Sequence, residues 1–162
     1  MPKITHLDFH ISYTCLNKCI FCSSADSVKK FSSHSLKTEE ILKILRNKRK
    51  LGFESVNFTG GEPTLFKNFF ELVKKTKKLG YRIYVGTNGG RFKDMEFCKK
   101  TAPFINEVCF SVHGHKSSLH NLHAQNSKSF NILNKAIKNL SNFPIRFSSN
   151  TVITKYNFFC LD

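Results

Sequence analysis

Tyr13–Cys22, which reads YTCLNKCIFC, is the most informative stretch of this 162-residue chain. It places Cys15, Cys19 and Cys22 in the spacing C-x3-C-x2-C. Three thiolates at this spacing can hold three corners of a cubane iron–sulfur cluster and leave the fourth iron without a protein ligand. An iron with an open position can bind and activate a small molecule, whereas a cluster with four thiolate ligands mainly transfers electrons. The spacing therefore predicts a [4Fe–4S] cluster with one open coordination position.

Two other interpretations of the cysteines stay open at this point. The three thiols could pack in a loop without metal, or they could bind zinc together with a distant histidine such as His10 or His34. Zinc sites usually have paired C-x2-C arms or a fourth ligand at short spacing, and this segment has neither. The remaining cysteines are scattered along the chain, and we expect them to be small buried apolar residues: Cys98, Cys109 and Cys160.

A second motif is the run GGEP at Gly60–Pro63. Two adjacent glycines let a backbone approach a ligand closely, and Glu62 adds a negative charge suited to a cationic amine. A turn without any ligand would explain the glycines and the proline equally well. The motif gains weight because it follows the cysteine run by one strand and helix.

The hydrophobic pattern alternates between strand and helix along the chain. It predicts strands over residues 4–12, 55–59, 81–87, 105–113 and 145–153. It predicts helices from an N-cap at Thr38 to Gly52, over 66–79, over 92–101 and over 130–140. Such alternation is typical of an α/β fold with a parallel sheet, here one domain spanning residues 1–162. The cysteine run, GGEP, the TNG run at 87–89 and the SVHG run at 111–114 all follow strands, at the edge where α/β folds place their chemistry.

With these motifs the sequence resembles the radical S-adenosylmethionine (SAM) superfamily. The resemblance is carried by the three cysteines with Phe21 between them and by GGEP, with weaker support from TNG, SVHG and residues 150–157. It covers about residues 7–157. It implies a partial (β/α) TIM-like barrel of about five parallel strands with alternating helices, an incomplete core domain whose sixth unit is missing. The fifth strand would then be a partly uncovered edge.

The resemblance also implies an activity. The open iron would chelate the amino and carboxylate groups of SAM, and one electron would cleave SAM to methionine and a 5′-deoxyadenosyl radical that abstracts hydrogen from an unassigned substrate, such as a peptide, a metabolite or a cofactor precursor. A reductant such as flavodoxin or ferredoxin would supply the electron. By position, Phe21 would lie near the adenine and the GGEP loop near the methionyl amine. The other implied cofactor-binding residues are Gly60, Gly61, Glu62, Pro63, Asn88, Ser111, His113, Asn150 and Val152. A truncated remnant that binds the cluster or SAM without catalysis is the alternative.

The charge and hydrophobicity of the chain indicate which classes of partner to expect. The net charge is +15, but 21 of the 26 cationic residues are lysine, whereas base reading favours arginine. We therefore expect solvated helix faces and no nucleic-acid partner, and an RNA-modifying enzyme remains a minor alternative. No apolar stretch has the length of a membrane span, so we expect a cytoplasmic protein without membrane contact. We expect His113, His115, His120 and His123 to face solvent or cap helices rather than form a second metal site.

Overall fold

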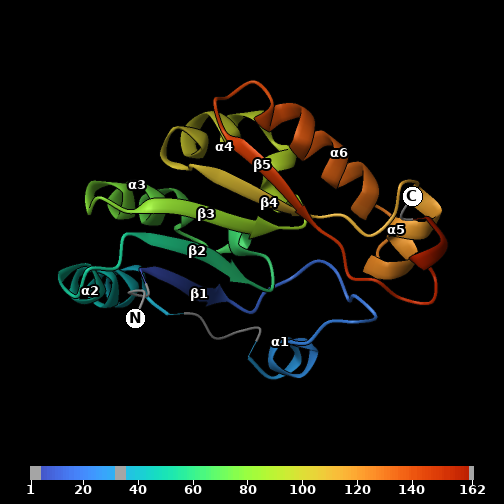
Figure 1. Ribbon diagram of the computed structural model, residues 1–162, viewed down its shortest axis with the longest axis horizontal. Helices are drawn as coiled ribbons and strands as arrows, with labels where there is room; N and C mark the ends of the chain where they lie inside the picture. Colours follow the sequence, from blue (N-terminus) through green and yellow to red (C-terminus); the bar gives the residue numbers. More distant parts are fainter. Residues whose placement is uncertain (1–4, 32–35, 161–162) are drawn as a thin grey trace.

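A single parallel sheet organises the computed structural model, which describes residues 5–31 and 36–160. Its five strands lie side by side in chain order: β1 (His6–Ser12), β2 (Ser55–Gly60), β3 (Arg82–Thr87), β4 (Glu107–Ser111) and β5 (Arg146–Asn150). All five arrows point toward the same side of the molecule, where α5 (Ser117–Ala124) lies (Figure 1). The predicted partial (β/α) barrel with about five parallel strands is confirmed.

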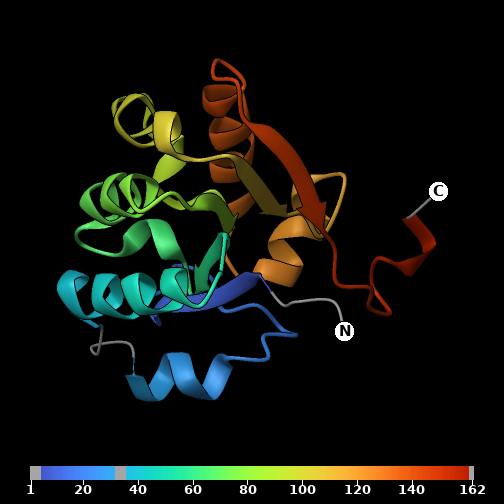
Figure 2. The same cartoon turned by 60° about the vertical axis from the view of Figure 1, so that its left-hand side comes forward.

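Four helices cover one face of this sheet (Figure 2). They are α2 (Thr38–Lys50), α3 (Phe69–Lys78), α4 (Met95–Thr101) and α6 (Ser129–Leu140). Short 3-10 turns, η1 (Pro63–Leu65), η2 (Gly90–Lys93), η3 (Ala102–Phe104) and η4 (Phe158–Cys160), complete the connections. Two helices were not predicted, α5 and α1 (Ala25–Phe31). Helix α1 has no buried residue and lies away from the other helices, on the β1 side of the sheet (Figure 1).

The core lies between the sheet and these four helices. Alternate residues of the strands point toward it, as Val56 and Phe58 do from β2, and they are fully buried. Leu42 of α2 and Leu72 of α3 close the core from the helix side. The intervening strand residues point to the opposite face and are polar or small. The fold thus buries its apolar residues on one face and leaves the other face for a cavity.

The predicted element ends are wrong in places. Thr38 is the first residue of α2 and not its cap, because the Glu40 carboxylate accepts the hydrogen bond from the backbone N–H of Lys37 at 2.7 Å. Helix α3 begins at Phe69 rather than at residue 66, because Phe66 is the C-cap of η1 and Asn68 is the N-cap of α3. Strands β4 and β5 are each shorter than predicted. The predicted first strand residue, Ile4, lies outside the described residues.

Strand β5 forms one edge of the sheet. All five of its residues are exposed, and no strand of the described residues pairs with its outer side. Phe147 contacts Phe110 of β4 with ring centroids 5.7 Å apart, which holds the strand against its one neighbour. The expected partly uncovered edge is therefore present. Separately, no helix in the described part of the chain is long and apolar enough to cross a bilayer.

Candidate functional site

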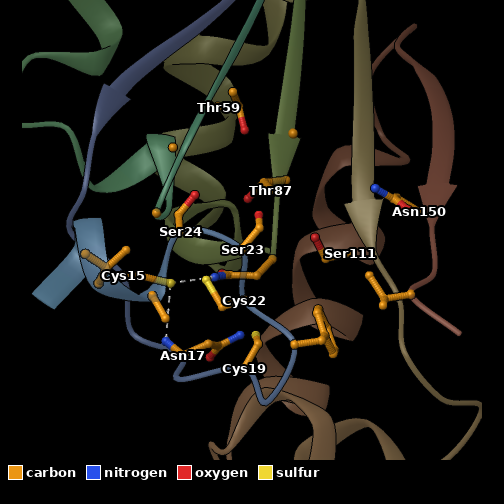
Figure 3. Close-up of a pocket in the computed structure, with 18 of the residues that line it drawn as sticks. Cys15, Asn17, Cys19, Cys22, Ser23, Ser24, Thr59, Thr87, Ser111 and Asn150 are labelled. Atoms are coloured by element: carbon orange, nitrogen blue, oxygen red, sulfur yellow. Dashed lines mark hydrogen bonds between the residues drawn. The ribbon is translucent and has the colours of Figure 1, made fainter. Parts of the chain in front are cut away.

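A cavity of about 900 Å³ opens at the carboxyl ends of the strands. In Figure 3 the cysteine loop lies on one side of it, and Ser111 of β4 and Asn150 of β5 lie on the other. Most of the site residues predicted from the sequence line this cavity: Cys15, Cys19, Phe21, Cys22, Gly60, Gly61, Asn88, Ser111, His113, Asn150 and Val152. Glu62 and Pro63 are not among the lining residues. Segments more than 130 residues apart in the chain thus meet around one space.

The three cysteines of the loop are half-buried free thiols. The sulfur of Cys15 accepts hydrogen bonds from the backbone N–H of Asn17 at 3.4 Å and from Asn88 Nδ2 at 3.5 Å (Figure 3). Burial raises the pKa of Cys15, and burial together with the nearby Cys15 and Cys22 sulfurs raises the pKa of Cys19 to about 11. The free thiols of Cys15 and Cys19 are therefore neutral at pH 7, and a metal centre bound by their thiolates must displace these protons.

The donor set fits a cubane better than a single ion. In the described part of the chain, no three His, Cys, Asp or Glu side chains are arranged to hold one metal ion. His10 lines the cavity without joining the cysteines in such a group, and His34 lies outside the described residues. In a cubane each thiolate binds a different iron, so three sulfurs surround a volume instead of converging on a point. Three soft thiol donors on one wall of a roomy cavity match that requirement.

The GGEP loop is fastened directly to the chain that enters the cysteine loop. Gly61 N–H donates to the Ser12 carbonyl and Glu62 N–H donates to the Thr14 carbonyl, both at 2.8 Å. A Cβ atom on Gly61 would come within 2.6 Å of the Thr14 oxygen. Gly60 has φ +140°, a conformation that favours glycine. The glycines are thus needed for backbone contact with residues 12–14, a reason that the motif alone did not reveal.

Glu62 is completely buried and its carboxylate is fully engaged within the protein. Oε1 accepts hydrogen bonds from Thr64 N–H at 3.1 Å and from the hydroxyls of Thr64 and Thr87 at 2.7 Å each. Oε2 accepts from the backbone N–H of Asn88 at 2.8 Å. Burial raises the pKa of Glu62, and these four donors oppose the rise. The carboxylate therefore joins the loop after β2 to the loop after β3, and its predicted contact with a ligand amine stays a prediction.

His113 forms part of the cavity wall beside Phe21. Their ring centroids are 4.5 Å apart in an edge-on arrangement. The backbone N–H of Val152 donates to His113 Nδ1 at 3.4 Å, so we assign the ring proton to Nε2. Burial, with smaller contributions from His120 and His123, lowers the pKa of His113 to about 4. At neutral pH the ring is therefore an uncharged hydrogen-bond donor.

The expectation that the histidines face solvent is wrong for His113, His120 and His123, which are all buried, whereas His115 is exposed. His120 accepts from His113 N–H at 3.3 Å and pairs with Ser129 Oγ at 3.1 Å. His123 donates from Nδ1 to the Leu119 carbonyl at 2.8 Å and pairs with Thr154 Oγ1 at 2.7 Å. These hydrogen bonds offset the free-energy cost of removing the ring nitrogens from water. The three rings do not form a metal-binding group among the described residues.

Two of the scattered cysteines also differ from expectation. Cys98 is buried as expected. Cys109 is only partly buried and lines the cavity from the inner face of β4, while Cys160 is exposed in η4. Alternation along β4 places Cys109 opposite the core-facing residues Val108 and Phe110. The strand period could have indicated this position.

Sequence reasoning also missed residues that line the cavity through the fold. Asn17, Ser23 and Ser24 come from the cysteine loop, and Thr59 comes from β2. Asn17 Nδ2 donates to Ser129 Oγ at 3.1 Å, a contact across 112 positions of the chain. Nothing in the local sequence signals a partner so distant.

Comparison with known proteins agrees with this geometry. The family described as the Radical SAM superfamily matches residues 9–158. An S-adenosylmethionine-dependent nucleotide dehydratase from Flammeovirga pacifica is 29% identical over 161 residues, covering 95% of this chain and 55% of that protein. A probable GTP 3′,8-cyclase from Saccharolobus islandicus (strain M.14.25 / Kamchatka #1) is 33% identical over 104 residues, covering 64% of this chain and 33% of that protein.

Solved structures show the same fold. SuiB from Streptococcus suis bound to its precursor peptide SuiA superposes with a TM-score of 0.78 at 24% identity, covering 93% of this chain and 33% of SuiB. The protein anSMEcpe with bound AdoMet and a peptide gives a TM-score of 0.71 at 22% identity, covering 94% of this chain and 44% of that one. The chain spans about half or less of the length of these proteins. Because the family match extends over nearly all its residues, the chain belongs to the radical SAM superfamily.

Proposed function

We propose that this chain provides the cluster-binding and SAM-binding part of a radical SAM enzyme whose substrate is unassigned. Cys15, Cys19 and Cys22 would hold a [4Fe–4S] cluster by three irons. When bound, the cluster supplies the electron that cleaves SAM and so generates a 5′-deoxyadenosyl radical, which takes hydrogen from the substrate. The observation that carries the proposal is that all three cysteines face the same cavity as Gly60 and Gly61.

Different residues of the cavity wall would bind different parts of SAM. Gly60 and Gly61 expose backbone at the cavity wall, where a methionyl amine can approach closely. Phe21 offers an aromatic face to the adenine. His113 Nε2–H, Ser111 and Asn150 supply neutral hydrogen-bonding groups for the ribose and carboxylate, and Asn88 and Val152 complete the wall. Glu62 would act without touching SAM, because it fixes the positions of Thr87 and Asn88 relative to the glycines.

The experiment is anaerobic reconstitution with iron and sulfide, followed by dithionite and SAM. We expect a brown protein that absorbs broadly in the visible range, and we expect 5′-deoxyadenosine to form. Both the colour and the product should be lost in Cys19→Ala. A matched control is Cys98→Ala, because Cys98 is buried in the core away from the cavity. A colourless protein would overturn the proposal, and so would 5′-deoxyadenosine formation that survives Cys19→Ala. Cluster and SAM binding without any cleavage would identify a catalytically inactive form.

A further inference from the structure

A second hollow lies on the outer side of the cysteine loop. This outer pocket, about 500 Å³ in volume, is lined mainly by Leu16, Lys18, Lys93, Asn126, Lys128 and Ile132. The three lysines are exposed, and none of the residues that line the pocket is acidic. Leu16 is also half-exposed, at 51% of its surface. The outer pocket is therefore an apolar spot surrounded by positive charge.

The outer pocket shares a wall with the candidate site. Leu16 is covalently bonded to Cys15 and Lys18 to Cys19, so the segment between the first two cysteines separates the two hollows. Lys18 lines both of them. Asn126 Nδ2 donates to the Leu16 carbonyl at 3.3 Å and to Asn17 Oδ1 at 2.9 Å, which fixes the far side of the outer pocket to this segment. A molecule bound here would lie one residue from two of the cysteines.

We propose that the outer pocket docks an acidic electron-transfer protein that reduces the cluster, an inference that rests on the proposed function. Carboxylates around the partner's redox group would face Lys18, Lys93 and Lys128, and its apolar contact would cover Leu16. The partner would give up one electron to a cluster held by Cys15, Cys19 and Cys22, and no bond would be made or broken and no proton transferred in this step. Such complexes are typically small and transient, which suits a shallow pocket.

Positive charge alone does not single out the outer pocket, because Lys29 and Lys30 of α1 also follow the cysteine loop. Lysines are abundant elsewhere, notably in the last turns of α2 and α3, but those turns lie at the carboxyl ends of their helices, away from the cysteine loop. A partner docked there could not approach the cluster. The outer pocket combines cations, an exposed apolar residue and direct continuity with the cysteine segment.

The test compares two charge-reversal variants for binding of a purified flavodoxin. Lys93→Glu with Lys128→Glu alters the outer pocket only, and Lys43→Glu with Lys78→Glu makes the same charge change on exposed residues of α2 and α3. We expect the dissociation constant to rise at least about tenfold for the first pair and to change less than about threefold for the second. Reduction by flavodoxin should slow in the first pair, whereas reduction by dithionite, which needs no docking surface, should not.

The two proposals fail in different ways. Equal weakening by both variants, or no weakening by either, overturns the docking site even if the chain carries a cluster and cleaves SAM. Conversely, a chain that takes up no iron fails the proposed function, because iron content is measured separately from flavodoxin affinity. Two results together support the docking site. Affinity for flavodoxin is lost only in the Lys93 and Lys128 variant, and added salt lowers the affinity of the unchanged protein.

Discussion

Buried threonine hydroxyls show how single residues hold the site. Thr87 Oγ1 donates to Glu62 at 2.7 Å and accepts from Gly89 N–H at 3.0 Å, whereas the buried hydroxyl of Thr76 in α3 has no hydrogen-bond partner among the described residues. Removing a satisfied buried group leaves its partners unpaired. We expect Thr87→Val to lower the free energy of unfolding by about 1–3 kcal/mol. Thr76→Val should leave it unchanged or raise it, as measured by urea unfolding, and equal losses would contradict this account.

The paired glycines give a second prediction at this scale. A Cβ on Gly61 would approach the backbone oxygens of Thr14 and Tyr13 to 2.6 and 2.7 Å, whereas a Cβ on Gly86 would meet Thr59 Oγ1 at an ordinary 3.7 Å. Gly61→Ala should therefore cost about 1–3 kcal/mol of unfolding free energy and reduce the iron retained after reconstitution. Gly86→Ala should change the unfolding free energy by less than about 1 kcal/mol. A harmless Gly61→Ala would mean that the two loops do not meet as described.

Among whole elements, α5 and the turn after it act as a clamp on the cysteine loop. Lys18 N–H donates to the Ala124 carbonyl and Ile20 N–H to the His123 carbonyl, each at 3.0 Å. Asn126 adds the side-chain bonds to Leu16 and Asn17. The segment after β4 thus orders the segment after β1, although the two are about a hundred residues apart.

This clamp predicts a local effect of Asn126→Ala. Because the variant removes two bonds to the cysteine loop, amide hydrogens of residues 16–22 should exchange with solvent several-fold faster. Asn139→Ala is the control, since Asn139 donates to the Phe92 carbonyl at 3.0 Å and makes a comparable bond elsewhere. Hydrogen-exchange mass spectrometry of the unloaded chain distinguishes them. Faster exchange of the loop in both variants would indicate general destabilisation instead of a clamp.

The buried histidines of α5 and the preceding loop predict a pH dependence. Unfolded imidazoles titrate near 6.5, while burial holds the pKa of folded His113 at about 4 and lowers that of His120. Between these values the unfolded chain binds more protons, so the free energy of unfolding should fall as the pH drops from about 6.5 to about 4. His113→Asn, which keeps an acceptor for Val152 N–H, should flatten this slope. His115→Gln, at an exposed position, should leave it unchanged.

These elements also show what the sequence could and could not predict. The strands and the four covering helices follow from apolar periodicity, and the place of the cavity follows from motifs that come after strands. Helix α5 was not, because its buried positions include His120 and His123, whose polarity hides the apolar face. Their burial depends on Ser129 and Thr154, which only the folded chain brings near. Likewise, the GGEP motif did not reveal the internal donors to Glu62, because Thr87 and Asn88 come from the end of β3 and the loop after it.

Across the whole molecule, β1 and β5 are the two edge strands of the described sheet, and β5 is exposed along its whole length. Arg146 N–H donates to the Asn106 carbonyl and the Asn150 carbonyl accepts from Val112 N–H, so these residues of β5 face β4. The backbone N–H and C=O groups of successive residues in a strand point alternately to its two sides. Those of Phe147 and Ser149 therefore point to the free edge. Unpaired edge groups are a template for pairing with another chain.

The free edge predicts self-association at high protein concentration. Ser149→Pro should reduce association, because it removes an N–H at the free edge without breaking a bond to β4. Ser148→Pro, whose N–H faces β4, should instead lower the free energy of unfolding by about 1–3 kcal/mol and should not protect the chain from association. Sedimentation velocity over a concentration series, together with urea unfolding, separates the two effects. If Ser149→Pro associates as readily as the unchanged chain, contacts other than the β5 edge drive association, and the exposed side chains of Ile153 and Phe159, at 65% and 76% of their surface, become the next positions to replace with lysine.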